Sequence, residues 1–353
     1  MFIVIAFLLT TFNSYAQLSY GDGSETCNWS SSTNMTQRIY NCESVTVSIG
    51  QTITFSGALD YIIIRSQGDV NILGTLNVSA NGVTAGPGGT ASGIVNNGGE
   101  GIAGSNAVDG GGGGGSGARF GNVTLPTAGA IGTGTTPGAG ANIPGAGYFP
   151  ENNFQNSFTG GAGGGAGGTG FDSGLELGGQ GGAGGGGLII IAKGQVSVSG
   201  NIISNGGNGV NGEATGNGLA GGGGGAGGSG GAIYIIGAQV DITGLVTALG
   251  GTGGSGGSSV ETGGDGGNGS SGRIRIDTSN SVYTGVATNP TAYQKNLPTI
   301  IDPLVSTPGN LKSDIEYSCV YKEAPSFDFY LNFLMGLLLV GFLQIPKGLR
   351  YRQ

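Results

Sequence analysis

Short apolar runs bounded by glycine recur along this chain, and each is followed at a similar distance by alternating apolar and polar positions. Two stretches repeat the pattern closely. Residues 188–207 read LIIIAKGQVSVSGNIISNGG, and residues 232–251, which start 44 residues later, read AIYIIGAQVDITGLVTALGG. Short β-branched runs between glycines favour strands over helices. Because the pattern repeats at a fixed interval, it predicts a stack of similar units.

The same unit recurs elsewhere in the chain. Residues 272–276, GRIRI, restate residues 231–235, GAIYI, and residues 61–76 carry the apolar positions of an earlier copy. Period-two alternation over residues 45–49 and 53–55 predicts two more strands. We therefore expect an all-β protein with a parallel β-solenoid over residues 45–285, in which neighbouring coils bury a thin continuous core.

The 44-residue offset makes this expectation specific. Five apolar residues of the first stretch should lie directly beside five of the second: Ile189, Ile191, Val196, Val198 and Ile202 beside Ile233, Ile235, Val240, Ile242 and Val246.

Glycine accounts for 83 of the 353 residues, concentrated in tracts at 82–187, 206–231 and 250–272. The other side chains in these tracts recur at every third residue, as in Thr252, Ser255 and Ser258. Three residues per turn is the polyproline II period, and glycine at the remaining positions would let such helices pack backbone to backbone. Glycine also loses the most conformational freedom on ordering. Packed glycine helices and flexible loops therefore both stay open.

Residues 224–235 read GGAGGSGGAIYI, a Gly-Gly-x tract that leads directly into a β-branched run. In this the chain resembles glycine-rich secreted proteins of bacteria, and more loosely the polyglycine-helix bundles of phage adhesins and of a snow-flea antifreeze protein. The resemblance implies an architecture and says almost nothing about an activity.

Both ends of the chain carry targeting patterns. Residues 1–16 contain an apolar run and end in Ser14-Tyr15-Ala16, which predicts a signal peptide cleaved before Gln17. Residues 327–345 are nearly all apolar and long enough to span a membrane. The basic tail at 346–353 then stays inside, and the residues before 327, including a linker at 286–326, lie outside.

The C-terminal pattern combines the Pro-containing segment 323–326, EAPS, with an apolar helix and a basic tip. It resembles the C-terminal sorting tails of bacterial surface proteins of the PEP-CTERM type. The Pro-Glu-Pro of that type and the LPxTG of sortase substrates are both absent. Enzymatic processing of the tail and a permanent single-span anchor remain alternatives.

Three cysteines occur in a chain that we expect to be exported, where disulfides persist. Cys27 and Cys42 should pair and close a small N-terminal cap at residues 17–44. Cys319 is then left over, as a free thiol, an intermolecular bridge or a modification site.

Composition excludes several classes of function. The chain has no histidine, so imidazole zinc ligands and Ser-His-Asp or Cys-His catalysis are excluded. The net charge of −8, without clustered Lys and Arg, argues against nucleic-acid binding. Carboxylates are scattered singly, and the segment 263–268 departs from the calcium nonapeptide in order and does not repeat. We expect no enzyme activity, no metal and no cofactor.

One segment interrupts the glycine tracts with aromatic and amide side chains. Its candidate ligand-binding residues are Tyr148, Phe149, Asn152, Asn153, Phe154 and Phe158. Such side chains suit a recognition loop for carbohydrate or protein. The alternative, which we favour, is that the aromatic rings plug the apolar side of a layer poor in side chains.

The expected function is that of a structural or adhesive protein of a bacterial cell envelope. Its expected partners are the membrane, through the C-terminal helix, and an envelope polysaccharide or protein, with self-association as a further option. A solenoid carbohydrate-active enzyme is the alternative, which clustered carboxylates or basic residues on one face would favour. An ice-binding protein is the third reading, which regular ranks of threonine would favour.

Overall fold

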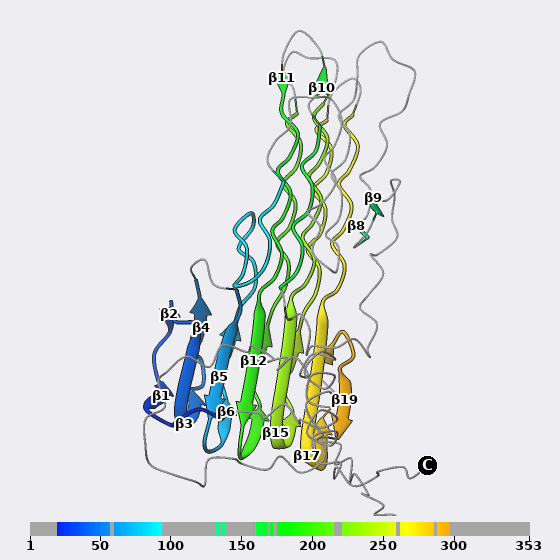
Figure 1. Ribbon diagram of the computed structural model, residues 1–353. Coiled ribbons are helices and arrows are strands. Elements are labelled where there is room, and N and C mark those ends of the chain that lie inside the picture. Colours follow the sequence, from blue (N-terminus) through cyan, green and yellow to red (C-terminus); the bar gives the residue numbers. More distant parts are fainter. Residues whose placement is uncertain are drawn as a thin grey trace, which may run out of the picture. The chain divides into compact units, whose positions relative to one another are not determined.

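The computed structural model describes residues 20–56, 60–93, 132–133, 136–137, 158, 160–168, 170–171, 175–214, 221–258, 262–285 and 288–296. All of them belong to one compact unit, Leu18–Ile301. The secondary structure of these residues consists of strands without a helix (Figure 1), so the all-β prediction is confirmed. No segment in this described part forms a helix of the length and apolarity that a membrane crossing requires. The predicted signal peptide, membrane helix, basic tail and Cys319 lie outside it.

Two parallel sheets contain most of the strands. The nine-stranded sheet consists of β1 (Glu25–Trp29), β3 (Ile39–Val47), β5 (Ile62–Ser66), β6 (Val70–Ile72), β12 (Gly187–Ala192), β13 (Gln195–Val198), β15 (Ala232–Ile242), β17 (Arg273–Gly285) and β19 (Tyr293–Asn296). The six-stranded sheet consists of β2 (Thr33–Met35), β4 (Thr52–Phe55), β7 (Thr75–Asn77), β14 (Asn201–Ile203), β16 (Leu245–Thr247) and β18 (Thr288–Asn289). Strands β18 and β19 thus lie within the stretch that we expected to be a linker.

Two short antiparallel pairs complete the described strands. They are β8 (Gly132–Thr133) with β9 (Thr136–Pro137), and β10 (Gly170–Phe171) with β11 (Leu175–Glu176).

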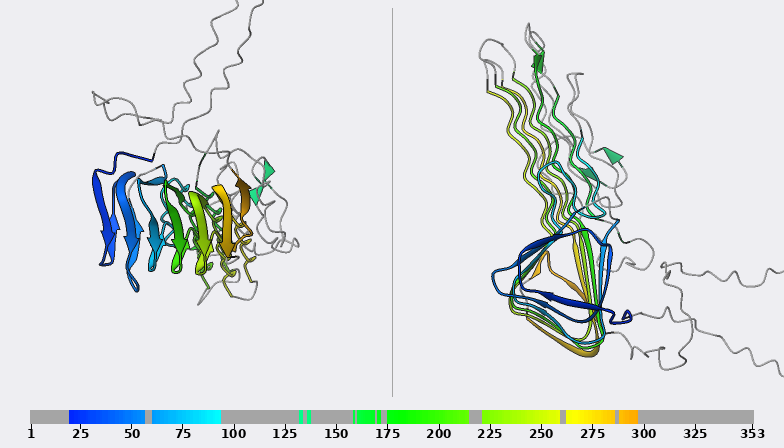
Figure 2. Two further views of the ribbon diagram at one scale, coloured as in Figure 1. Left: turned by 90° about the horizontal axis from the view of Figure 1, so that it is seen from below. Right: turned by 90° about the vertical axis from the view of Figure 1, so that its left-hand side faces the viewer.

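Six strands of the large sheet form a closed ring of parallel pairings, β12–β5–β3–β6–β13–β15, which the β12–β15 pairing completes. The ring closes because β3 and β15 are long enough that each pairs with two other strands of the ring. Residues 39–42 of β3 pair with β5, whereas residues 45–47 pair with β6. Seen end on, the strands trace a closed outline around the core (Figure 2).

The repeated stretches lie side by side, but their register differs from the predicted one at β12. Val196, Val198 and Ile202 lie beside Val240, Ile242 and Val246, which confirms the 44-residue offset there. In β12, however, Leu188 pairs with Ile233, an offset of 45. The prediction for Ile189 and Ile191 was therefore wrong, since they lie beside Tyr234 and Ile236.

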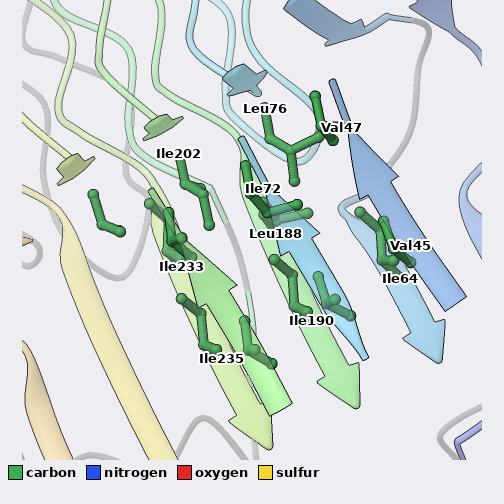
Figure 3. Close-up of a cluster of buried hydrophobic side chains, with 14 of the residues drawn as sticks. Val45, Val47, Ile64, Ile72, Leu76, Leu188, Ile190, Ile202, Ile233 and Ile235 are labelled. Carbon is green, nitrogen blue, oxygen red and sulfur yellow. The ribbon is translucent and has the colours of Figure 1, made fainter. Parts of the chain in front are cut away.

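The physical reason is one extra residue in the first stretch. Seven positions separate Leu188 from Gln195, whereas six separate their partners Ile233 and Gln239. A slip of one residue exchanges the two faces of a strand. Leu188 and Ile190 therefore enter the main core together with Ile233 and Ile235 (Figure 3), and Ile189 and Ile191 join a separate cluster.

The other repeat alignments agree with the sequence. Ile233 pairs with Ile274 of β17, and Leu188 pairs with Ile62 of β5. The strand predicted at residues 45–49 ends at Val47, and the side chain of Ile49 is 78% exposed.

The main core is an aliphatic column between aromatic ends. At one end the ring of Tyr40 packs edge-on against Trp29 and Phe55, with ring centroids 5.8 Å and 6.0 Å away. Tyr283 packs against the core from β17. The large rings fill the volume where the stack of short strands stops, which keeps water from the aliphatic residues between them.

A disulfide joins Cys27 of β1 to Cys42 of β3, with their Cα atoms 5.6 Å apart. Among the described strands, β1 pairs with β3 alone, so it is an edge strand of this sheet. The bond ties this edge covalently to the sheet.

Candidate functional site

The glycine tracts in the described part form six extended arms that connect the strands. We number them arm 1 (160–168), arm 2 (177–186), arm 3 (204–213), arm 4 (221–231), arm 5 (248–258) and arm 6 (262–272). Arms 3 and 5 follow β14 and β16, whereas arms 2, 4 and 6 lead into β12, β15 and β17 (Figure 1).

The backbone amides of arm 4 donate hydrogen bonds in three directions, and successive amides donate to different arms. Gly222, Gly225, Gly228 and Gly231 donate to carbonyls of arm 3. Gly223, Ala226 and Ser229 donate to arm 1, and Gly224, Gly227 and Gly230 donate to arm 6. The three sets differ by one residue in phase, which requires a backbone that turns once in three residues. Each amide from Gly222 to Gly231 therefore has a partner.

Glycine is required at these positions because the arms touch through their backbones. A Cβ atom added at Gly225 or Gly228 would lie closer than 3.0 Å to the backbone of arm 2, and one added at Gly254 would meet arm 3 in the same way. The few buried side chains are small. The hydroxyl of Ser229 accepts a hydrogen bond from the amide of Ala162 at 2.6 Å.

Where an arm has no neighbouring backbone to accept its amide hydrogen bonds, side-chain oxygens accept them. Three asparagines of arm 3 accept backbone hydrogen bonds from arm 5 through Oδ1: Asn205 from Leu249, Asn208 from Thr252 and Asn211 from Ser255, at 2.8, 2.9 and 2.8 Å. In arm 6, Asn268 and Asp265 accept the amides of Gly253 and Gly256 of arm 5, each at 2.9 Å. These side chains close the edge of the bundle.

The outer residues of arms 3, 5 and 6 form a polar face. Its exposed members are Asn208, Asn211, Thr252, Ser255, Ser258, Thr262, Asp265 and Asn268. The period-three pattern pointed to Thr252, Ser255 and Ser258 of arm 5. The asparagines of arm 3 were missed, although their spacing of three in the stretch NGGNGVNG carries the same signal.

The candidate ligand-binding segment is described at one residue only. Tyr148, Phe149, Asn152, Asn153 and Phe154 lie outside the described residues. Phe158 packs edge-on against Tyr61, with ring centroids 5.3 Å apart. It also contacts the apolar cluster of Tyr20, Ile63, Ile189, Ile191 and Ile236. Phe158 therefore lies against side chains of the strands.

The charged groups of the strands make structural contacts. Arg275 donates to both carboxylate oxygens of Asp277, at 2.7 to 3.0 Å, and lies near the rings of Tyr234 and Tyr293. Burial alone lowers the pKa of Arg275, but its hydrogen bonds to Asp277 and the nearby charges outweigh burial, so the pKa is raised. A buried guanidinium held in this way stays charged and braces the end of the sheet.

Other carboxylates serve the backbone or a neighbouring strand. Asp69 accepts the amide of Gln195 at 2.8 Å, and Asp241 accepts the hydroxyl of Thr284 at 2.6 Å. Within the described part, no three Cys, Asp or Glu side chains are grouped so that they could hold a metal ion.

Comparison with known proteins identifies no relative, because no family model, curated protein or solved structure matches the chain significantly.

Proposed function

We propose that this protein is an exported structural or adhesive component of a cell envelope, in which a parallel β-solenoid carries a bundle of polyglycine II helices. The observation that carries the proposal is the three-directional hydrogen bonding of arm 4. Backbone-to-backbone packing of this kind makes an extended element rigid without a side-chain core. It leaves little room for a pocket but provides a long surface.

The strand pairings support the solenoid. Successive strands β5, β6 and β7 pair in parallel with β12, β13 and β14, each at the corresponding position. Strands β15 and β16 continue the series. Parallel neighbours that advance together along the chain are what coils of a solenoid require.

Two features support export. The Cys27–Cys42 disulfide is of a kind that persists in oxidising compartments and is rare in the cytosol. The apolar leader at 1–16 and the apolar stretch at 327–345 fit a protein that is translocated and then anchored. In this proposal the membrane is one partner, and an envelope polysaccharide or protein contacts the polar face.

The alternatives receive less support. Asp69, Asp241, Asp265 and Asp277 each accept a hydrogen bond from another group of the chain, which gives these four carboxylates a structural role. The polar face mixes Asn, Ser and Thr and therefore differs from the regular threonine rank that would favour ice binding.

The test is to express the full chain in a bacterium with a two-membrane envelope and to label intact cells with a membrane-impermeant reagent. Labelling, together with an oxidised Cys27–Cys42 pair, is the expected result. Deletion of residues 327–353 should release a soluble product. Recovery of the full chain from the cytosol with Met1 retained and both thiols reduced would contradict export.

The bundle is tested separately by adhesion of the same cells to polysaccharide-coated and protein-coated surfaces. Gly225→Ala places a methyl group against the backbone of arm 2 and should reduce adhesion while export continues. Ser199→Ala, which removes one exposed hydroxyl between β13 and β14 and lies outside the polar face, is the control. Equal adhesion of wild type and Gly225→Ala would remove the bundle from the proposal.

A further inference from the structure

Asn–Gly pairs are concentrated in and beside the glycine arms. Those in the described part are Asn81-Gly82, Asn205-Gly206, Asn208-Gly209, Asn211-Gly212 and Asn268-Gly269. In such a pair the backbone nitrogen of glycine can attack the side-chain carbonyl carbon of asparagine, because glycine has no side chain to obstruct the approach. The new C–N bond closes a succinimide and the amide leaves as ammonia. Water then opens the ring to aspartate or isoaspartate.

We propose that Asn81 is a site of spontaneous deamidation, and that the glycine bundle protects the Asn–Gly pairs of its arms from the same reaction. The inference does not depend on the proposed function. It follows from the hydrogen bonds of the two reacting groups, which differ between Asn81 and the arms.

Both reacting groups are held in the arms. The amides of Gly206, Gly209 and Gly212 donate to carbonyls of arm 5 at 2.8 to 2.9 Å, and the amide of Gly269 donates to Gly251 at 2.9 Å. The side chains of the preceding asparagines are held through Oδ1 by amides of arm 5. Attack therefore requires that two hydrogen bonds to a neighbouring arm open together.

Asn81 and Gly82 lack these restraints. The backbone of Asn81 makes two hydrogen bonds with Thr84, but neither its side chain nor the amide of Gly82 has a hydrogen-bond partner among the described residues. Both residues are exposed. Gly82 has φ of 58°, and no atom lies within 4 Å of where its Cβ would be. Among the described residues, neither the nucleophilic amide nor the side-chain carbonyl is thus held by a hydrogen bond of its own.

The reaction at Asn81 has a structural consequence. Isoaspartate adds a methylene to the backbone and a negative charge to the turn between residues 81 and 84. The carbonyl of Gly82 accepts the amide of Ala183, which ties this turn to arm 2. Conversion of Asn81 should therefore loosen the contact with arm 2 at Ala183.

The experiment incubates the native full-length protein in mildly alkaline buffer and follows each Asn–Gly pair by peptide mapping with isoaspartate detection. Asn81 should convert at least about tenfold faster than Asn208 and Asn211. This is the ratio expected if the arms are open in about one tenth of the molecules at any time. In denaturant the rates at the three sites should become similar, because the arms no longer exist. Equal rates in the native protein, or rates in denaturant that still differ as in the native protein, would overturn the proposal.

A pair of variants tests the hydrogen bond itself. Thr252→Pro removes the amide that holds Asn208, and proline fits the polyproline II backbone of the arm. It should accelerate deamidation of Asn208 several-fold and leave Asn81 unchanged. Ser258→Pro is the matched control, because the amide of Ser258 holds no asparagine among the described residues. If both variants left the rate at Asn208 unchanged, the side-chain bond would not be the protecting feature.

Discussion

Asn208 accepts a hydrogen bond through Oδ1 from the backbone amide of Thr252, a residue 44 positions further along the chain. Asn205 and Asn211 make the equivalent bonds on either side of it. Because the three asparagines recur at the period of the glycine backbone, one side-chain type closes the edge between arm 3 and arm 5. These three backbone amides at the edge of the bundle therefore have acceptors within the same chain.

Substitution Asn208→Ala should weaken this edge. A net intramolecular hydrogen bond contributes about 0.5–1.5 kcal/mol, so stability should fall by roughly that amount. The amide of Thr252 should exchange faster in a hydrogen-exchange experiment, and Ser255→Ala serves as the control because it keeps the acceptor at 208. Unchanged exchange at Thr252 would mean that the bond contributes nothing in solution.

Substitution Gly228→Ala should disrupt the bundle from within. The added methyl group would lie against the carbonyl of Ala183, and overpacking of a close contact costs about 1–3 kcal/mol. We expect a lower melting temperature, with the exposed Ser258→Ala close to wild type. If Gly228→Ala melts like wild type, the arms are looser in solution than their hydrogen bonds indicate.

Substitution Val240→Asp should unfold the neighbouring strands. Val240 is fully buried between Val196 and Tyr283, and burial of a valine contributes about 1.5–3 kcal/mol. A carboxylate at this position adds an unpaired charge to an apolar core, which costs more still. The adjacent Gln239→Asp points to the other face and should be tolerated. Circular dichroism melting curves distinguish the two, and equal curves would contradict the register.

The burial of Tyr283 predicts that the free energy of unfolding falls at alkaline pH. Burial raises the pKa of Tyr283, so the unfolded chain, with a tyrosine pKa of about 10, loses this proton first. Stability from this residue is therefore complete below about pH 10 and falls as the pH rises above it. Burial likewise raises the pKa of Tyr40, which adds to the same loss.

Tyr283→Phe should reduce the alkaline loss without removing it, because Tyr40 remains. The hydroxyl of Tyr283 is buried without a hydrogen-bond partner in the described part of the chain, so its removal should cost little near neutral pH. Denaturant unfolding measured on both sides of about pH 10 tests this. Parallel stability curves for the variant and wild type would show that Tyr283 does not titrate as its burial requires.

Reduction of the disulfide, or Cys27→Ser, should destabilise the N-terminal edge. The bond closes a loop with a sequence separation of 15, for which the chain-entropy model gives about 3 kcal/mol. The fluorescence of Trp29, which packs beside the bond in the same core, reports the transition. Cys319→Ser leaves this bond in place and should not change the transition.

The strands could be predicted from the sequence because short β-branched runs between glycines favour strands over helices. Val196 and Val198 were matched correctly to Val240 and Ile242 by spacing alone. The match failed at Leu188, because the connection Ala192-Lys193-Gly194 holds one residue more than its counterpart Gly237-Ala238. Only the pairing in space decided that Leu188, and not Ile189, enters the main core.

The candidate site followed a similar division. The period of three in Thr252, Ser255 and Ser258 was visible in the sequence, but it left packed glycine helices and flexible loops both open. Their partners were not visible, since the bond from Thr252 to Asn208 joins residues that only packing brings together.

Local pattern by itself determined the strands, the glycine tracts and their period, because these depend on backbone sterics within a few residues. Tertiary structure decided which glycines tolerate no side chain, since Gly225 and Gly228 are constrained by Gln180 and Ala183 of arm 2, each 45 residues away in the chain. It also decided the role of the asparagines. A backbone amide at an edge donates to whichever acceptor lies nearby, and proximity between distant segments is a property of packing, not of local sequence.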